Sequence, residues 1–500
     1  MKVSQPSLNE ISLDPQSWDE LRATGHRMLD DMFDYLKNIR DKPVWQPLPK
    51  ETKNALDTPV PEDGTDASKV YQEFVEHVLP FNLGNVHPRF WGWVCGTGTA
   101  GGMLADMLAS GMNASPSFGE HADVYVEKQV ISWAKSLFGF SADSSGLLTT
   151  GASMANVLAL TVARNHFNDS FRSKGLQSAK QLVAYASAET HNCIQKTIEL
   201  LGIGSEHLRK IPVDESYCVR TDLLQKKIEE DIKNGFQPFC IIGNAGTVNT
   251  GAIDDLEILA RLAKKYGCWF HIDGAFGAVL NILPEYSEKL KGLRLADSLA
   301  LDFHKWFYVN YDAGCVLVRD ASVHRNAFSV NASYLQQHER GLIAGKEHYN
   351  HLGIELSRGF RALKIWMSIK EHGLDKYRQL VRQNLQQAQY LAGLISANDQ
   401  LELLAPVDMN IVCFRFVVPG LDNDKLNELN KEILMQLHES GSALPSFTVL
   451  NGRYAIRAAI TNHRSRREDF DLLIREVVRL GRNISQTVSK PVEPIEVIQP

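Results

Sequence analysis

The sequence predicts an α/β fold, in which helices cover both faces of a mainly parallel sheet and a smaller α+β unit follows. Two observations lead to this prediction. Between Gly146 and Val318, short apolar runs alternate with amphipathic helical stretches, as in sheets that are buried on both faces. From residue 410 onward the order becomes strand, helix, strand, helix, which indicates a second and smaller unit.

The sequence pattern of the N-terminal region predicts a helical arm. Apolar residues recur at helical spacing between Ser17 and Lys42, with Ser17 placed as the N-cap and Glu20 three residues later. A Pro- and Thr-rich connection, 43–66, separates this helix from a second one at 70–78. Because an apolar arm outside the main unit needs a surface to pack on, we expect it to lie against the partner subunit of a homodimer.

The next segment, 85–102, is rich in Gly and aromatic residues and is predicted to be a loop. Two interpretations of its aromatic residues remain open. Phe90, Trp91 and Trp93 either fill part of the core or form the wall of a pocket that binds a flat apolar ligand. A helix is expected after this loop, at 124–137.

The predicted sheet is built from alternating strands and helices. Strands are expected at 181–186, 208–213, 239–243, 268–272, 298–301 and 314–318, with helices at 155–165, 194–201, 221–234 and 255–266. Ligands of such sheets lie beyond the carboxyl ends of the strands. Asp273 and Lys305 each follow a predicted strand closely, so we expect them to meet at this edge.

The remaining segments complete the predicted organisation. A loop is expected at 331–353 and a long helical segment at 363–398, followed by strands at 410–418 and 454–460 and helices at 424–440 and 467–483. We therefore predict an N-terminal arm (1–84), a large domain (85–372), a small C-terminal domain (373–486) and an extended, Pro-rich tail (487–500).

Composition and charge exclude several classes of protein. With 44% hydrophobic and 22% charged residues over 500 positions, the chain is expected to be globular with more than one domain. The net charge of −6 and the scattered Lys and Arg give no electrostatic footprint for nucleic acid. The seven cysteines form no CxxC pair, and neither a signal peptide nor a run of about twenty apolar residues occurs. We therefore expect a cytoplasmic protein with no membrane span.

Two motifs suggest a reactive amine and an anion site. Lys305 lies in the motif DFHKW between a strand-like run and an aromatic run, and an apolar setting favours the neutral amine that attacks carbonyls. Most lysines are solvated surface charges, which is the alternative. In TTGASMAN, residues Gly151, Ala152 and Ser153 begin a helix, where backbone NH groups and a hydroxyl can bind a phosphate. A plain N-cap is the alternative here.

A third motif, HIDGAFG, places Asp273 at a strand end among apolar neighbours, where a carboxylate needs a cation or a donor. One interpretation is a structural cap. Another is a metal site with His271 and His304, but HExxH-type spacing and a second carboxylate cluster are both missing, so no metal is expected. The third takes the lysine, the acid and the helix start together, because pyridoxal phosphate needs anchors for its aldehyde, ring nitrogen and phosphate.

With these motifs the chain resembles the group II pyridoxal-phosphate amino-acid decarboxylases, which act on aromatic amino acids, histidine, glutamate or cysteine sulfinate. The resemblance extends over about 18–486 and rests on HPRFWGW, GMLADML, TTGASMANVLAL, ETHNCIQKTIELLG, GTVNTGAIDDL, HIDGAFG, DFHKW and RGFRALKIW. It implies the aspartate-aminotransferase-like fold type I, pyridoxal 5'-phosphate as cofactor, a large domain that binds it, and an obligate homodimer with active sites at the interface.

The resemblance also implies a role for each matching residue. Lys305 would bind the cofactor aldehyde, Asp273 would pair with the pyridinium nitrogen, and His191 of ETHNC would stack on the ring. Further cofactor contacts would come from Ala152, Ser153, Thr247, Ala275 and His304.

Substrate contacts and the proton donor are inferred in the same way. Phe90, Trp91 and Trp93 favour an aromatic substrate, and Arg457 resembles an arginine near the substrate carboxylate. Tyr349, which stands 11 residues before Phe360, resembles the loop tyrosine that protonates the substrate carbon, and Tyr334 is the alternative.

One departure concerns the phosphate. Where aromatic-acid members usually have Asn-Pro before the His-Lys pair, this chain has Asp302-Phe303, and an acid there repels a phosphate. Either Asp302 turns away or the phosphate relies on other donors.

The sequence therefore predicts pyridoxal-phosphate-dependent decarboxylation of an L-amino acid, with an aromatic one expected, to the amine and carbon dioxide. An aldehyde synthase or an aminotransferase on the same cofactor is the alternative among enzymes. A cofactor-free interaction protein is the alternative outside enzymes. Neither nucleic acid nor a membrane is expected as a partner.

Overall fold

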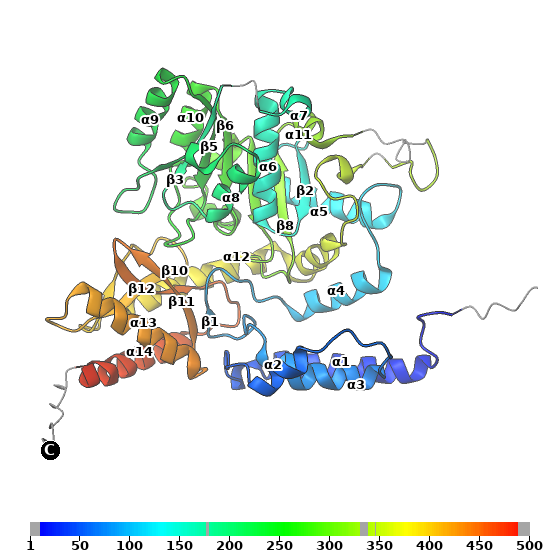
Figure 1. Ribbon diagram of the computed structural model, residues 1–500, viewed down its shortest axis with the longest axis vertical. Coiled ribbons are helices and arrows are strands. Elements are labelled where there is room, and N and C mark those ends of the chain that lie inside the picture. Colours follow the sequence, from blue (N-terminus) through cyan, green and yellow to red (C-terminus); the bar gives the residue numbers. More distant parts are fainter. Residues whose placement is uncertain (1–10, 177–179, 331–338, 346, 489–500) are drawn as a thin grey trace, which may run out of the picture.

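The computed structural model describes residues 11–176, 180–330, 339–345 and 347–488. Two β-sheets organise this part of the chain, and an N-terminal helical arm lies beside them (Figure 1). The larger sheet occupies the upper part of the view, the smaller sheet lies below it, and the arm follows the lower edge.

The larger sheet has seven strands in the order β2-β8-β7-β6-β5-β3-β4. β3 to β7 pair in parallel, whereas β8 is antiparallel to both of its neighbours, β2 and β7. The prediction of a mainly parallel sheet is therefore confirmed. The strands are β2 (Ser145–Thr149), β3 (Leu182–Ser187), β4 (Leu208–Ile211), β5 (Gln237–Asn244), β6 (Trp269–Asp273), β7 (Ser298–Asp302) and β8 (Gly314–Val318).

Helices cover both faces of this sheet. Along β7, Leu299 and Leu301 belong to a core shared with α5, α9 and α10, whereas Ala300 faces a second core with α6 and α8. Successive side chains of a strand point to opposite faces, so a strand of apolar residues throughout needs cover on both sides. The helices of this region are α4 (Ala100–Met112), α5 (Ala122–Phe138), α6 (Ala152–Phe167), α7 (Phe171–Lys174), α8 (Asn192–Leu200), α9 (Thr221–Lys233), α10 (Leu256–Tyr266) and α11 (Ala321–Phe328).

The smaller sheet has five strands in the order β1-β11-β12-β10-β9. β1 (Phe90–Trp91) pairs in parallel with β11, so a segment that precedes the large sheet in the chain is built into the small one. The other strands are β9 (Leu401–Leu403), β10 (Ile411–Phe416), β11 (Leu444–Leu450) and β12 (Arg453–Ala459), and the helices are α12 (Arg361–Ser396), α13 (Asn423–Glu439) and α14 (Arg467–Val488). Gly373, with a φ of 68°, interrupts the helical backbone of α12.

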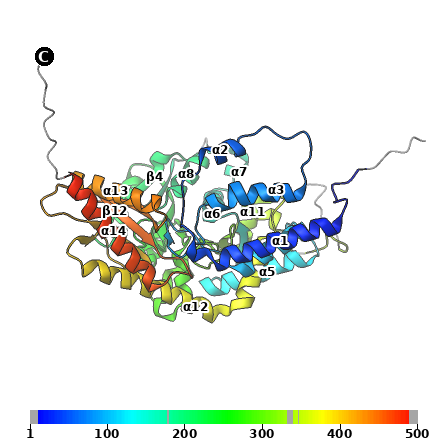
Figure 2. The ribbon, with the colours of Figure 1, turned by 90° about the horizontal axis from the view of Figure 1, so that it is seen from below.

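The arm consists of α1 (Trp18–Lys37), α2 (Lys50–Leu56) and α3 (Ala67–Glu73). As predicted, Ser17 caps α1 by accepting a hydrogen bond from the Glu20 NH at 3.3 Å. α1 lies beside α3 (Figure 2) and has no buried residue, so that apolar side chains such as Phe33, 38% exposed, are left uncovered in the single chain. Part of the apolar surface of α1 is therefore exposed in the single chain.

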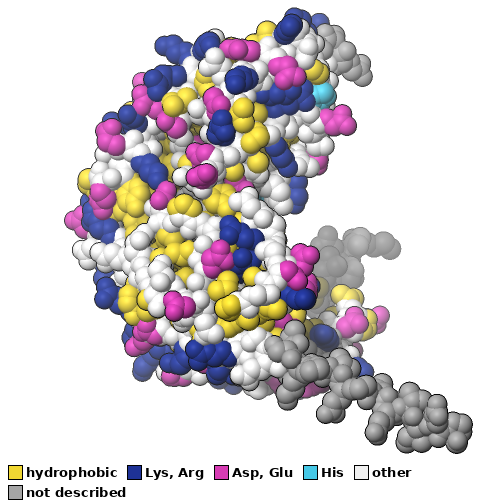
Figure 3. Space-filling view, turned by 90° about the vertical axis from the view of Figure 1, so that its left-hand side faces the viewer, with side chains coloured by type: hydrophobic (Ala, Val, Ile, Leu, Met, Phe, Trp, Pro, Cys, Tyr) yellow, Lys and Arg dark blue, Asp and Glu magenta, His cyan; other side chains and the backbone are white. Residues whose placement is uncertain are grey.

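Side chains of both signs intermix over the face shown in Figure 3, with apolar patches between them. Within the described part of the chain, no helix is both long enough and apolar enough to cross a lipid bilayer. The division at residues 84, 372 and 486 stays a prediction. The pairing of β1 with β11 shows that the segment after residue 84 contributes a strand to the small sheet.

Candidate active site

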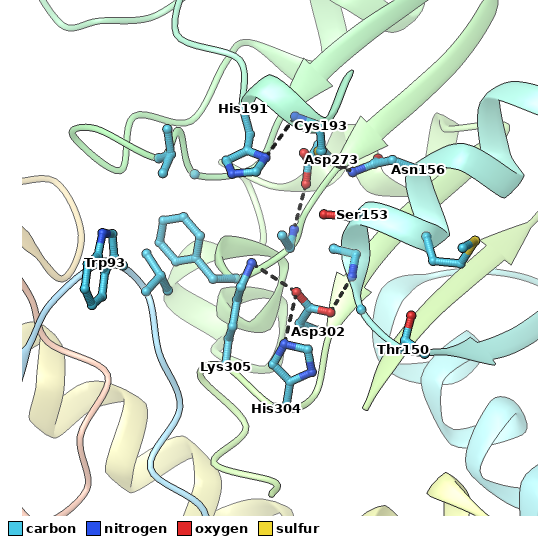
Figure 4. A pocket seen from close by; sticks show the side chains of 18 of the residues that line it. Trp93, Thr150, Ser153, Asn156, His191, Cys193, Asp273, Asp302, His304 and Lys305 are labelled. Carbon is cyan, nitrogen blue, oxygen red and sulfur yellow. Dashed lines mark hydrogen bonds and ion pairs between the residues drawn. The ribbon is translucent and has the colours of Figure 1, made fainter. Parts of the chain in front are cut away.

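A cavity of about 430 Å³ lies at the carboxyl ends of β6 and β7, where α6 and α8 begin. Lys305, Asp273 and the turn that starts at Gly151 all line it, together with His191 (Figure 4). The structure thus brings together residues that are up to 154 positions apart in the chain, at the sheet edge where the sequence places them.

Lys305 follows β7 and lies between carboxylates. Its Nζ is 3.0 Å from Asp302 Oδ2, and its side chain is 23% exposed. Burial lowers the pKa of the Lys305 ammonium, but attraction to Asp302 and Asp273 outweighs burial and raises the pKa above its usual value. The expectation of a neutral amine in an apolar setting is therefore wrong for the single chain, because two acids lie beside it.

Asp273 ends β6 and is held by donors. Its Oδ1 accepts a hydrogen bond from the Ala275 NH at 3.1 Å, and its Oδ2 accepts one from Asn156 Nδ2 at 3.3 Å. Burial raises the pKa of Asp273, and the nearby Lys305 opposes that rise. A carboxyl so placed is suited to hold a proton against a ring nitrogen, because its own position is fixed by the sheet and by α6.

A hydrogen-bonded chain continues behind Asp273. Asn156 Oδ1 is 2.6 Å from His271 Nε2, and His271 Nδ1 is 2.8 Å from the Ser298 hydroxyl. Burial lowers the pKa of His271 to about 3, so the ring stays neutral. The possible metal ligand His271 is thus engaged inside the protein, and the described residues contain no group of three or more His, Cys, Asp or Glu side chains placed to hold a metal.

His191 caps α8 and faces the cavity. Its Nδ1 accepts a hydrogen bond from the Cys193 NH at 3.2 Å, and burial lowers its pKa. The ring is therefore neutral and fixed by one nitrogen, with its flat face available to the cavity (Figure 4).

The turn before α6 is open to an anion on one side. Gly151, Ala152 and Ser153 line the cavity, and the Ser153 side chain is exposed there. Gly314 lets β8 pass close to this turn, because a Cβ on it would lie 2.4 Å from the Gly151 Cα. The Ala152 NH already donates to Asp302 Oδ1 at 2.6 Å, so Asp302 does not turn away from the predicted phosphate site.

His304 and Ala275 also line the cavity, as predicted. His304 Nδ1 accepts a hydrogen bond from the Ala313 NH at 3.0 Å, and its ring centroid lies 4.3 Å from that of Tyr311. Burial lowers the pKa of His304. Gly96 permits this packing, since a Cβ there would lie 1.8 Å from the His304 carbonyl oxygen.

The three aromatic residues of the 85–102 segment lie in different environments. Trp93 lines the cavity and is 56% exposed. Phe90 and Trp91 are 3% and 0% exposed, and Trp91 stacks on Phe470 with centroids 4.9 Å apart. The prediction that Phe90 and Trp91 contact substrate is corrected: strand pairing with β11 directs both rings into packed cores.

Arg457 does not reach the cavity either. Its guanidinium donates to the carbonyl oxygens of Trp93 and Asn249, each at 3.0 Å, and to that of Val248. Burial lowers the pKa of Arg457 to about 10. Instead of facing a substrate carboxylate, Arg457 joins the two loops that carry Trp93 and Val248, which line the cavity.

Thr247 is not among the residues that line the cavity, and its cofactor contact stays a prediction. Its hydroxyl is 3.2 Å from that of Thr250 and accepts a hydrogen bond from the Ala252 NH at 3.1 Å, so it closes a turn. Its neighbours Gly246 and Val248 line the cavity in its place.

Tyr349 departs furthest from expectation. It is 4% exposed, packs in the core with α6 and α8, and has the Arg358 guanidinium 5.5 Å from its ring centroid. Its ring packs within its own subunit and is not among the residues that line the cavity of the single chain, and its role as the loop tyrosine stays a prediction. The alternative, Tyr334, lies outside the described residues.

Sequence reasoning did not single out several residues that line the cavity, among them Asn156, Cys193, Phe276 and Tyr311. Asn156 carried a signal, since it is a polar residue on the apolar face of a predicted helix, four positions after Ala152. Phe276 lies inside HIDGAFG, but a single apolar residue gives no sign of its direction.

Residues 49–417 match the family model of the pyridoxal-dependent decarboxylase conserved domain. The chain belongs to the pyridoxal-dependent decarboxylase family. Its cofactor is accordingly pyridoxal phosphate, and the cavity residues fit that group, because amine, buried acid and helix start lie around one space.

Two curated members of this family illustrate the similarity. The chain is 33% identical to an aromatic-L-amino-acid decarboxylase of Bacillus atrophaeus over 479 residues, which cover 94% of this chain and 97% of the relative. It is 30% identical to a phenylacetaldehyde synthase of Arabidopsis thaliana over 466 residues, which cover 90% and 93%.

Solved structures show the same fold. A crystal structure of Oryza sativa TDC with PLP and tryptamine superposes with a TM-score of 0.88 at 23% identity, covering 95% of this chain and all of that chain. Mouse CSAD gives a TM-score of 0.86 at 22% identity, covering 93% and 99%. The predicted α/β architecture of fold type I is thereby confirmed.

Proposed function

We propose that this family member decarboxylates an aromatic L-amino acid to the amine and carbon dioxide. The observation that carries the proposal is the convergence of Lys305, Asp273 and the α6 turn on one cavity. When bound, pyridoxal phosphate supplies a ring that accepts the electron pair left on the substrate carbon as carbon dioxide departs.

The residues of this chain divide the work of binding and orientation. Lys305 would hold the cofactor aldehyde and later release the product, Asp273 would keep a proton on the ring nitrogen, and His191 would lie against the ring face. Ser153 and the turn before α6 would bind the phosphate. The fixed hydrogen bonds of Asp273 and His191 support these roles, since each side chain is oriented before any ligand arrives.

An aromatic substrate is supported by the cavity walls. Trp93, Val94, Val248 and Phe276 are apolar, and Lys305 is the only Lys or Arg among the described residues that line the cavity. An acidic substrate side chain would lack a cation there. The decarboxylase from Bacillus atrophaeus, at 33% identity, acts on aromatic amino acids by its name, which agrees with this assignment.

A second candidate function is an aldehyde synthase. It is favoured by two observations: Tyr349 is packed away from the cavity, and an Arabidopsis thaliana phenylacetaldehyde synthase is 30% identical. If no side chain returns a proton to the substrate carbon, that carbon can instead be oxidised by molecular oxygen. The products would then be the aldehyde, ammonia and peroxide, besides carbon dioxide.

The proposal includes a cytoplasmic homodimer with active sites near the interface. Its support is the uncovered apolar face of α1 and the absence of disulfides among seven free cysteines.

The test is a product analysis. Purified protein with added pyridoxal phosphate is incubated with each aromatic amino acid, with dihydroxyphenylalanine and with hydroxytryptophan, and carbon dioxide, amine, ammonia and peroxide are measured together. Equal amounts of carbon dioxide and amine are expected, and Lys305→Ala should form neither. Carbon dioxide with equal ammonia and peroxide would identify the aldehyde synthase, and no carbon dioxide from any of them would contradict both functions.

A further inference from the structure

Asp302 lies where the turn before α6 meets the reactive lysine. Its Oδ1 accepts the hydrogen bond from the Ala152 NH at 2.6 Å, and its Oδ2 lies 3.0 Å from Lys305 Nζ and 3.6 Å from His304 Nε2. Figure 4 shows the carboxylate between these groups, on the side of the cavity opposite Asp273. One carboxylate therefore engages both a donor of the helix start and the nearest cation.

The backbone around Asp302 is fixed. The Asp302 NH donates to the Ala275 carbonyl at 3.1 Å, and the Phe303 NH donates to the Ala313 carbonyl at 2.8 Å. The side chain is 3% exposed. Only a rotation of the side chain can take the carboxylate away from Ala152, and a rotated carboxylate remains inside the protein.

Asp302 faces titratable and charged groups from three elements. Lys305 and His304 come from the loop after β7, the NH groups at the start of α6 carry the positive end of the helix dipole, and Asp273 contributes a second negative charge from β6. A phosphate dianion at this helix start would meet a carboxylate that already occupies one donor. Two anions that share one set of donors repel each other.

We propose that Asp302 acts as a built-in anion at the phosphate site, residues 150–153. In the cofactor-free protein it satisfies the Ala152 NH and neutralises Lys305, and it lowers the affinity for the cofactor by competing with the phosphate for the same donors. This inference rests on the proposed function, since it requires pyridoxal phosphate to bind at Lys305.

Asp302 affects the binding of the cofactor in two ways, through the phosphate and through the aldehyde. The two effects can be measured separately. It opposes the phosphate through the Ala152 NH. It also keeps Lys305 as an ammonium, which must lose a proton before its amine can attack the aldehyde. Pyridoxal has the aldehyde but no phosphate, so its binding reports the second effect alone.

The test variant is Asp302→Asn, which removes the charge and keeps the shape. Asp297→Asn is the matched control: Asp297 precedes the other end of β7, accepts the Phe270 NH at 2.8 Å and is not among the residues lining the cavity. Asp302→Ser is made alongside in case the Asn variant does not fold. Dissociation constants for pyridoxal phosphate and pyridoxal are measured by absorbance titration of stripped protein, and melting temperatures are measured with and without inorganic phosphate.

We expect Asp302→Asn to lower the dissociation constant for pyridoxal phosphate about tenfold or more, because a like-charge contact is removed. The constant for pyridoxal should fall clearly less, and inorganic phosphate should raise the melting temperature of the variant more than that of the wild type. Asp297→Asn should leave all three measurements unchanged.

An unchanged or higher dissociation constant for pyridoxal phosphate in folded Asp302→Asn and Asp302→Ser would overturn the inference. An equal gain for pyridoxal would also overturn it, because the effect would then act through Lys305 alone. A wild-type protein that forms no visible absorbance band sensitive to Lys305→Ala would instead overturn the proposed function itself.

Discussion

At the scale of single residues, the charge around Lys305 decides how the amine becomes reactive. Asp302 and Asp273 raise the pKa of Lys305, which favours the ammonium form of its side chain. A bound cofactor must therefore change these contacts before Lys305 reacts.

Substituting the two candidate tyrosines should affect product formation differently. Tyr349→Phe should leave amine formation close to wild type, because the Tyr349 ring is 4% exposed and packed away from the cavity. Tyr334→Phe should lower amine formation roughly 100-fold and raise aldehyde formation, if Tyr334 returns the proton to the substrate carbon. Amine and aldehyde are measured by mass spectrometry from one incubation. The reverse pattern would show that Tyr349 leaves its core to act at the site.

The residues that sequence reasoning expected at this sheet edge, and that line the cavity, share one property. Lys305, Asp273 and Ser153 lie directly after a strand or at a helix start, and a parallel sheet brings these positions to one edge. Arg457 and Thr247 do not line the cavity, because their direction depends on hydrogen bonds to distant backbone groups, which no local pattern records.

At the scale of elements, α11 is tied to β2 by His324. Its Nδ1 is 2.6 Å from the Ser145 hydroxyl and its Nε2 is 2.8 Å from the Leu352 carbonyl oxygen, and burial lowers its pKa from 6.5 to about 4. Since the unfolded chain takes up this proton at a higher pH than the folded one, the contribution to stability is complete above pH 6.5. It is lost as the pH falls from 6.5 toward 4.

We therefore expect the free energy of unfolding of wild type to fall more steeply over this pH range than that of His324→Gln. The difference in slope should approach about 1.4 kcal/mol per pH unit. Urea unfolding at several pH values between 4 and 7 measures it, and parallel profiles for the two proteins would refute the assignment.

The contact between β8 and the turn before α6 gives a second test. Gly314→Ala places a Cβ 2.4 Å from the Gly151 Cα and should weaken cofactor binding, with a loss of stability of about 1–3 kcal/mol from overpacking. Gly393→Ala in α12 is the control, since a Cβ there meets nothing within 4 Å and should stabilise by about 0.5–1 kcal/mol. Absorbance titration and urea unfolding compare the two, and equal effects would contradict the role of Gly314.

Helices with a clear period and the apolar strands β7 and β8 were predicted well, whereas β1 and β2 were not predicted. α10 (Leu256–Tyr266) and α13 (Asn423–Glu439) lie within two residues of their expected bounds. β1 has only two residues, Phe90–Trp91, which are too few to show alternation. They become a strand because they pair with the edge of β11.

At the scale of the whole molecule, the arm is expected to hold two subunits together. Leu21 and Phe33 on α1 are each 38% exposed, so Leu21→Glu combined with Phe33→Glu should convert a dimer to monomers. Arg22→Glu on the same helix is the control and should stay dimeric, since Arg22 is an exposed charged residue that pairs with Asp19 on its own helix. Sedimentation velocity measures the masses, and a monomeric wild type would refute this prediction.

The large-scale plan was open to prediction because alternating strands and helices have few ways to pack. Composition and periodicity did not predict the path that the chain takes between the two sheets. The 85–102 segment crosses from the small sheet to the cavity, and its Gly96 packs against the carbonyl of His304. Such a crossing depends on long-range contacts and not on local propensity.

The central claim is that Lys305 holds the cofactor in the cavity that it shares with Asp273. The most direct test is to load the protein with pyridoxal phosphate, reduce it with borohydride, digest it and locate the modified peptide by mass spectrometry. We predict one modified residue, Lys305, with modification abolished in Lys305→Ala. Modification of another lysine, or none at all in protein shown to be folded, would contradict the account.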